Sequence, residues 1–130
     1  MSNLNAVENI YAAFATGDIP ALLELFDPAI EWVAAENSPL ANHSPYRGLN
    51  QVVEGVFTRI GLEFPGLAVQ NDELLDAGNK IIMLGRYHGV RKATGKGFHA
   101  QVVHVWTITG GKASKFQQYL DTYQVAQTAE

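Results

Sequence analysis

The sequence predicts an α+β fold in which three N-terminal helices pack on one face of a strongly curved, mainly antiparallel sheet. Two observations support this prediction. In the first half of the 130-residue chain, apolar residues recur at helical spacing in three separate stretches. In the second half, apolar residues alternate along runs separated by glycine-containing turns, which is typical of strands joined in hairpins. Chains with helices first and strands afterwards usually gather the helices on one side of an antiparallel sheet.

The three helices are bounded by recognisable start and stop residues. The first is expected over residues 4–16, where Gly17 ends it. The second is short and begins after Asp18, whose carboxylate can accept from the first free backbone N–H groups. The third is expected to begin at Asn50 and to end before Pro65, because proline cannot continue a helix.

Five strands are expected, separated by turns and one long loop. A strand over residues 29–35 leads into a loop of about a dozen residues, 36–48, and irregular loops of that length are usually functional or mobile. The chain after Val125 is expected to be frayed. A sheet curved around helices leaves a cone-shaped pocket that is open at one end. The later strands are expected at residues 67–77, 80–90, 98–109 and 113–123.

Composition limits the classes of function. The length predicts a single domain over residues 1–130. The net charge of −4 is spread along the chain, and the sequence shows no basic patch for nucleic acid. No apolar run approaches the ~20 residues of a membrane span, and a cytoplasmic protein is expected. Apolar residues make up 47 % and charged ones 17 %, which suits a chain that buries a homodimer face, a pocket, or both.

His104 is the central candidate for a functional side chain. It lies in the middle of a strand whose sequence, over residues 102–112, is VVHVWTITGGK. Burial among apolar neighbours would lower its pKa and keep the imidazole neutral. A neutral imidazole could donate to a developing oxyanion or relay a proton, whereas a core histidine would only satisfy a neighbouring polar group. Both interpretations stay open.

Two charged residues could complete a catalytic group with His104. Arg86 shares a face of its strand with His88 and two apolar residues, and an arginine on such a face requires a carboxylate partner. Asp121, at the end of the last strand, is the natural candidate for that partner. Alternatively, Asp121 is a solvated strand-end residue and Arg86 a surface or dimer-face residue.

Aromatic side chains are expected to line the pocket for a flat, apolar ligand. Some of them must instead belong to the core. No metal or cofactor site is expected, because His99 and His104 fall on opposite strand faces and no nucleotide-binding glycine motif is present. The aromatic candidates are Tyr11, Trp32, Tyr46, Phe57, Trp106 and Tyr119, and His88 is added to them as a possible ligand contact.

Five stretches together resemble the nuclear-transport-factor-2-like superfamily, and within it the SnoaL-like relatives of polyketide cyclases and ketosteroid isomerases. The resemblance implies a cystatin-like α+β barrel. The isomerase residues do not carry over, since their protonated aspartate corresponds to His104 and their general base falls near Trp32. The SnoaL-like acid/base aspartate corresponds to Asp121, in Tyr119-Leu120-Asp121. The stretches are IYAAFATGD (10–18), ALLELFDPAIEW (21–32), YRG (46–48), GRYHG (85–89) and VVHVWTITGGKASKFQQYLD (102–121).

The resemblance implies a small-molecule-binding protein, and it leaves open whether the protein is an enzyme. A cofactor-independent cyclase or isomerase acting on a hydrophobic carbonyl compound would use Asp121 as base, His104 as donor or relay and Arg86 as charge partner. The alternatives are a non-catalytic ligand-binding or dimerisation module and, less favoured, an epoxide-hydrolase-like hydrolase. An open cavity containing Asp121 and His104 would favour chemistry or ligand capture. A cone plugged by Trp106, Phe57 and Tyr119 would favour a structural role.

Overall fold

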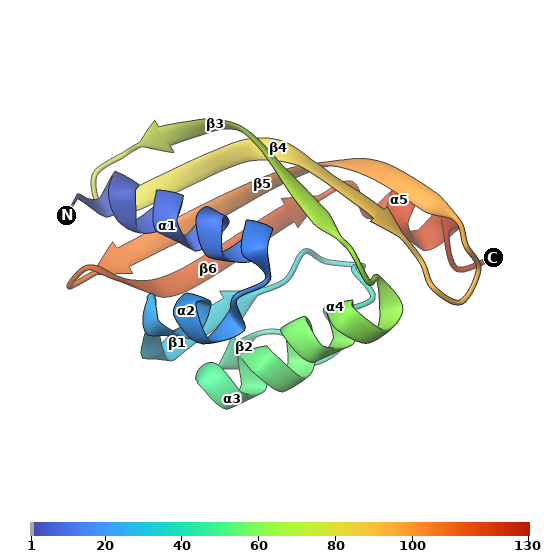
Figure 1. Cartoon of the computed structure of the whole chain (residues 1–130), viewed down its shortest axis with the longest axis horizontal. Coiled ribbons are helices and arrows are strands. Elements are labelled where there is room, and N and C mark those ends of the chain that lie inside the picture. Colours follow the sequence, from blue (N-terminus) through green and yellow to red (C-terminus); the bar gives the residue numbers. More distant parts are fainter. Residues whose placement is uncertain (1) are drawn as a thin grey trace.

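The computed structural model describes residues 2–130, in which one six-stranded sheet curls around a group of helices (Figure 1). The strand order is β2-β1-β6-β5-β4-β3, and this arrangement confirms the predicted α+β class. The elements are α1 (Asn3–Thr16), α2 (Ile19–Glu24), β1 (Phe26–Val33), β2 (Tyr46–Arg47), α3 (Leu49–Val52), η1 (Val53–Phe57, a π-helical turn), α4 (Thr58–Glu63), β3 (Ala68–Asp76), β4 (Lys80–Val90), β5 (Gly97–Thr109), β6 (Lys112–Leu120) and α5 (Thr122–Gln127).

The helices begin and end where local chemistry allows. Ser2 caps α1 by accepting from the Asn5 amide, and Gly17 ends it in the left-handed region at φ 68°. The predicted third helix is continuous from α3 through η1 to α4. At Gly55 in η1 a Cβ atom would lie 2.2 Å from a ring carbon of Tyr46, so the helix approaches β2 this closely only because a glycine stands there.

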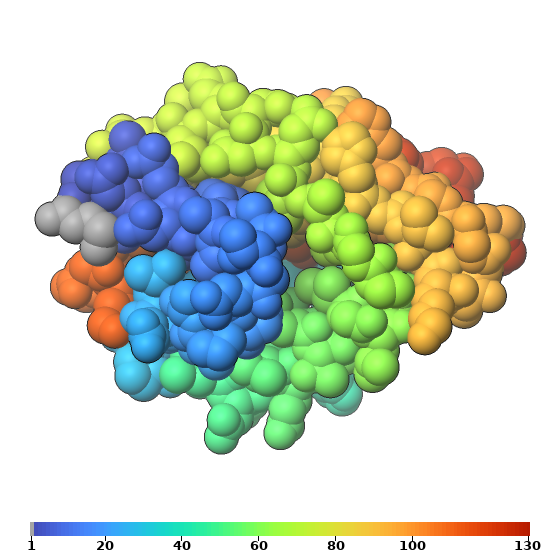
Figure 2. All heavy atoms as spheres, viewed as in Figure 1, coloured from blue at the N-terminus to red at the C-terminus, as the bar shows by residue number. Residues whose placement is uncertain are grey.

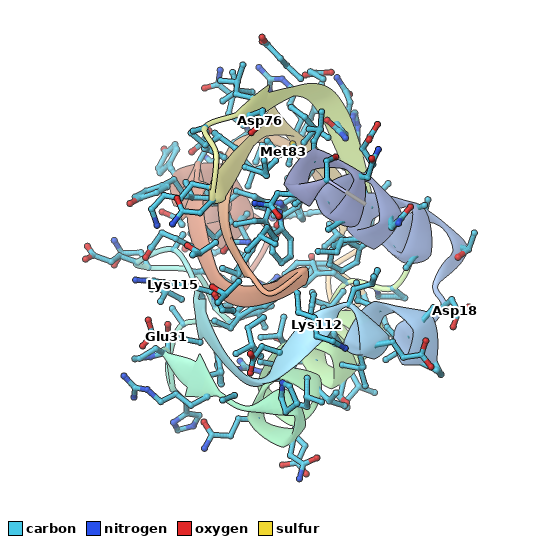
Figure 3. The ribbon with its side chains drawn as sticks, turned by 90° about the vertical axis from the view of Figure 1, so that its left-hand side faces the viewer. Asp18, Glu31, Asp76, Met83, Lys112 and Lys115 are labelled. Atoms are coloured by element: carbon cyan, nitrogen blue, oxygen red, sulfur yellow. The ribbon has the colours of Figure 1, made fainter. Side chains whose placement is uncertain are left out.

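The sheet is antiparallel except for one pair of strands. Strands β3 to β6 form successive antiparallel pairs, and β1 runs parallel to β6. In this register His104 lies between Met83 of β4 and Gln118 of β6, so these three side chains share the concave face. Figure 3 views the curl from its end, with the ion pair between Glu31 and Lys115 (3.4 Å) on the outside of the sheet.

The core lies where α1, β1, β5 and β6 meet. Its largest side chains are fully buried aromatic rings, including Trp106 and Phe116. Trp32 stacks on Phe116 with ring centroids 3.8 Å apart. Because these rings close one end of the cone, the remaining space between helices and sheet lies toward α4 and β3. Within residues 2–130 no helix is both long and apolar enough to cross a membrane.

The C-terminal segment differs from the prediction. Residues 122–127 form helix α5 instead of extending the last strand, because Asp121 accepts from the Gln124 amide and caps a helix there. The predicted frayed tail is also wrong, since Val125 and Thr128 are buried. Thr128 accepts a hydrogen bond from Arg91 Nε (3.0 Å), which ties the end of the chain to the β4–β5 connection.

Candidate ligand-binding site

A cavity of about 780 Å³ lies between the concave face of the sheet and the helices. Its walls are mainly apolar, with aromatic side chains from α1, β1, η1, β4, β5 and β6, and from Phe64 directly after α4. Figure 2 shows a hollow between the end of α1 and the segment that joins α4 to β3. Gly17 at the end of α1 and Gly66 in the joining segment both line the cavity, as does Gly61 of α4, so this hollow is its mouth.

The long loop after β1 forms one wall of the cavity. Leu40 lines the cavity and lies in a loop that is held against α4 by Arg59. The Arg59 guanidinium donates to the Pro39 carbonyl (2.7 Å) and to the Asn42 side chain (2.6 Å). This loop is therefore part of the site, as its length suggested.

A buried hydrogen-bonded group lies at the inner end of the cavity. His104 is 2 % exposed, and its two ring nitrogens contact two tyrosine hydroxyls. Nδ1 lies 2.7 Å from the Tyr11 hydroxyl, and Nε2 lies 2.5 Å from the Tyr87 hydroxyl. Tyr11 comes from α1 and Tyr87 from the concave face of β4, so the group joins the helix layer to the sheet.

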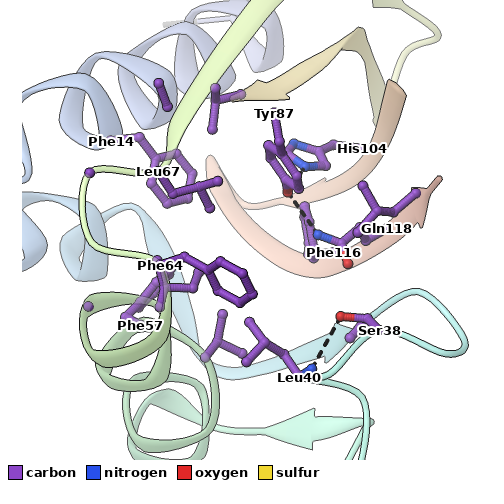
Figure 4. A pocket seen from close by; sticks show the side chains of 18 of the residues that line it. Phe14, Ser38, Leu40, Phe57, Phe64, Leu67, Tyr87, His104, Phe116 and Gln118 are labelled. Carbon is purple, nitrogen blue, oxygen red and sulfur yellow. Dashed lines mark hydrogen bonds between the residues drawn. The ribbon is translucent and has the colours of Figure 1, made fainter. Parts of the chain in front are cut away.

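Two donors complete this group at its ends. Trp106 Nε1 donates to the Tyr11 hydroxyl oxygen at 2.8 Å. Gln118 Nε2 donates to the Tyr87 hydroxyl oxygen at 2.8 Å, as Figure 4 shows. We refer to Trp106, Tyr11, His104, Tyr87 and Gln118 as the polar network.

Burial keeps the network uncharged near neutral pH. Loss of solvent lowers the pKa of His104 to about 3 and raises the pKa of both Tyr11 and Tyr87 well above the ordinary value. None of the described residues that line the cavity is aspartate, glutamate, lysine or arginine. The site is therefore suited to an uncharged molecule with few polar atoms.

Four of the predicted site residues lie at the cavity. His104, Tyr11, Trp32 and Phe57 all line the cavity. The Tyr11 hydroxyl faces His104, 2.7 Å from its Nδ1.

Two predicted aromatic contacts belong to the core instead. Trp106 is fully buried behind Tyr11, and the Tyr46 hydroxyl donates to the Leu40 carbonyl. Neither side chain lines the cavity. Trp106 and Tyr46 shape the cavity indirectly. Trp106 bonds Tyr11 and Tyr46 bonds Leu40, and both of these partners line the cavity.

The other predicted site residues lie on the opposite side of the sheet or beyond its end. Arg86 and His88 point outward from β4, where Arg86 donates to the His99 carbonyl (3.0 Å) and His88 bonds Gln70. Tyr119 also points outward and is 58 % exposed. The prediction placed these residues on the wrong side of the sheet, because alternate positions of a strand share a face and here the other set of positions faces the helices.

Asp121 does not reach the cavity. It follows β6, caps α5 and bonds the Gln124 side chain (3.1 Å). Asp121 and Arg86 both border a shallow depression on the outer face, but no ion pair joins them among residues 2–130. The structure therefore does not form the predicted group of Asp121, Arg86 and His104.

Sequence reasoning missed Tyr87 and Gln118. The signal for Tyr87 was present, since Ile81, Met83 and Tyr87 alternate on one face of their strand as clearly as the residues between them do on the other. Aromatic lining residues were also missed: Phe14, Phe64, Phe98 and Phe116. No group of three or more histidine, aspartate or glutamate side chains within residues 2–130 could hold a metal ion.

The curved sheet, the helices inside it and the apolar cavity between them define a cone-shaped α+β protein. The model of the SnoaL-like domain family matches residues 7–116, and the chain belongs to this family, within the NTF2-like superfamily.

Solved structures agree with this assignment. An NTF2-like protein from Burkholderia thailandensis E264 is 38 % identical, with a TM-score of 0.95 over 100 % of this chain and 98 % of its own. An NTF2-like protein of unknown function from Burkholderia pseudomallei K96243 is 25 % identical, with a TM-score of 0.89 over 98 % of each chain. A protein with a cystatin-like fold from Xanthomonas campestris, 19 % identical, shares the fold with a TM-score of 0.85 over 96 % of this chain and 95 % of its own. The search of curated proteins found no match.

Proposed function

We propose that this protein binds a small, uncharged, hydrophobic molecule inside the cone. The observation that carries the proposal is the cavity of about 780 Å³, with mainly apolar walls and a single polar group at its inner end. Ligand sites typically enclose roughly 300–1,000 Å³, are mostly apolar and carry a few convergent polar groups that orient the ligand. The dimensions and chemistry of the cavity both agree with this description.

The arrangement of the aromatic side chains argues against a purely structural role. Trp106 lies behind Tyr11, Tyr119 lies outside the cone, and Phe57 forms part of the wall. None of the three fills the space, so the cone is open rather than plugged.

The same arrangement favours binding over the predicted acid–base chemistry. An acid–base enzyme needs a group that accepts a proton near neutral pH. Asp121 lies outside the cavity, and His104 is a weak base because burial lowers its pKa to about 3. An epoxide-hydrolase-like reaction would need Arg86 and Asp121 in the site. We therefore propose ligand binding as the primary activity.

Blocking the mouth of the cavity tests the proposal. Gly61 lies on α4, lines the cavity and has no atom within 4 Å of the position of an added Cβ, so the variant Gly61→Trp can fold and cover the mouth. We expect it to bind the neutral fluorescent probe N-phenyl-1-naphthylamine at least about tenfold more weakly than the wild type, which is roughly 1.4 kcal/mol. Fluorescence titration measures both affinities.

The matched control for this experiment is the neighbouring residue. Leu62 is 65 % exposed and does not line the cavity, so Leu62→Trp adds the same side chain outside the mouth. We expect its affinity for the probe to stay within about twofold of the wild type. A wild-type protein that does not bind the probe, or a Gly61→Trp variant that binds it normally, would contradict the proposal.

We also propose that the protein forms a homodimer through the outer face of the sheet. Ile82, Leu84, Val103 and Val105 are only partly buried there, and the exposed Tyr119 lies on the same face. Apolar side chains that gather on one sheet face are typical of an interface. These observations support the proposal, and its test is the state of association.

A charge at the centre of this face should separate the subunits. We expect Val105→Glu to sediment as a monomer under conditions in which the wild type sediments as a dimer, because a carboxylate in an apolar interface loses its hydration. Ala12→Glu, at an exposed position of α1, should leave the dimer intact. Sedimentation velocity distinguishes the two states, and a monomeric wild type would refute the prediction.

A further inference from the structure

We propose that Tyr87 and Gln118 form a two-donor subsite that binds a carbonyl oxygen of the ligand. This inference depends on the proposed binding function and specifies the chemical class of the ligand: flat, uncharged compounds that present a ketone or quinone oxygen at their buried end.

The direction of the hydrogen bond at each end of the network is determined by groups that can only donate. The Trp106 ring nitrogen has a proton and no acceptor lone pair, so the Tyr11 oxygen must accept from it (2.8 Å). At the other end, the backbone amide of Ala35 donates to Gln118 Oε1 (3.1 Å), which identifies the carbonyl side of that side-chain amide. Gln118 Nε2 therefore faces Tyr87 and donates to its hydroxyl oxygen (2.8 Å).

The centre of the network holds one proton more than it can use. Two hydrogen bonds link Tyr11, His104 and Tyr87. A neutral imidazole supplies one proton and the two hydroxyls supply two more, which makes three protons for two bonds. One hydroxyl proton must therefore point away from His104, and since both tyrosines line the cavity, the cavity is available to it.

The tautomer with the proton on Nε2 places this hydroxyl proton at Tyr87. In it, Tyr11 donates to Nδ1, and Nε2–H donates to the Tyr87 oxygen. That oxygen then accepts from both His104 and Gln118, so it has no lone pair left for a ligand donor, while its own proton is free. Gln118 Nε2 has a second proton for which no partner occurs among residues 2–130. In this tautomer, which a ligand oxygen at Tyr87 would stabilise, two donors and no free hydroxyl acceptor meet at this point.

The subsite lies in surroundings that strengthen such hydrogen bonds. Figure 4 shows Tyr87, His104 and Gln118 on one wall of the cavity, beside Phe116 and facing the apolar side chains of Phe64 and Leu67. Hydrogen bonds are electrostatically stronger in an apolar environment than in water. A ligand oxygen that accepts two of them would also hold the imidazole in a single tautomer.

Three tricyclic compounds of nearly equal shape test the inference. Fluorenone carries a carbonyl oxygen, fluorene carries a methylene group at the same place, and carbazole carries an N–H donor there. We expect the wild type to bind fluorenone about tenfold more tightly than fluorene, as two modest net hydrogen bonds would provide. Carbazole should bind no more tightly than fluorene.

Substitutions assign the preference to the subsite. In Tyr87→Phe we expect the advantage of fluorenone over fluorene to fall from about tenfold to about threefold, because only Gln118 still donates to the carbonyl oxygen. Tyr119→Phe, the same substitution on the exposed outer face, should retain the full preference. The carbonyl stretching band of fluorenone bound to the wild type should lie below its frequency in hexane, and this measurement needs no variant.

The outcomes separate this inference from the function on which it rests. If none of the three compounds binds the wild type, the binding function itself is wrong. The subsite is wrong, and the binding function stands, if the three compounds bind with equal affinity or if carbazole binds best. The same conclusion follows if fluorenone keeps its full tenfold advantage in Tyr87→Phe, or if the carbonyl band stays at its hexane frequency.

Discussion

Replacement of His104 by phenylalanine is expected to lower the free energy of unfolding by about 2–5 kcal/mol. His104 bonds the hydroxyls of Tyr11 and Tyr87, and all three side chains are buried. A phenyl ring has nearly the same shape but no polar atom, so each hydroxyl loses a partner. Each hydroxyl oxygen still accepts from Trp106 or Gln118, but the proton or lone pair that faced His104 loses its partner, which costs roughly 1–3 kcal/mol at each tyrosine. Urea denaturation monitored by circular dichroism measures the loss.

A histidine of the same strand serves as the control. His99 lies on the outer face of β5 and is exposed, where its ring stacks on His88. His99→Phe should change the free energy of unfolding by less than about 0.5 kcal/mol, as most surface substitutions do. A loss below 1 kcal/mol in His104→Phe would show that the network contributes little to the stability of the fold.

Acidification should destabilise the protein through the same histidine. Burial lowers the pKa of His104 from 6.5 to about 3. Between these values the unfolded chain binds a proton that the folded protein does not bind, so the free energy of unfolding falls as the pH falls. The slope approaches about 1.4 kcal/mol per pH unit. From pH 7 to pH 5 we expect His104 to account for a loss of about 2 kcal/mol.

The His104→Phe variant isolates this contribution. Urea denaturation of both proteins at pH 7 and pH 5 gives the difference in stability at each pH, and groups common to both proteins cancel. Because the variant has no imidazole to protonate at this position, we expect the difference to shrink by about 2 kcal/mol at the lower pH. A difference that does not depend on pH would mean that His104 takes up its proton equally well in the folded protein.

The elements of the fold could be predicted because their signals are local. The limits of β4, residues 80–90, were predicted correctly from alternation and from the turns beside it. The error at α5 has a local cause too. Thr122 and Tyr123 are residue types that favour a strand, which is why a strand was predicted there. In the structure Asp121 caps a helix instead, and that helix buries Val125 and Thr128.

The site was only partly predictable, because alternation divides a strand into two faces without saying which face is inside. In β4 one set contains Ile82, Leu84 and Arg86, and the other contains Met83 and Tyr87. Both sets are apolar enough to be buried. Arg86 was assigned to the site for this reason, and Tyr87 was overlooked.

The sequence by itself determined the α+β class, the order of the elements and the burial of a neutral histidine in the strand VVHVWTITGGK. Only the tertiary structure decided what His104 contacts, because its partners Tyr11 and Tyr87 come from α1 and β4, which lie far apart in the chain. The packing of α1 against the concave face selects the strand positions that point inward. That packing places Tyr87 and Gln118 at the cavity and leaves Asp121 at the start of α5, outside it.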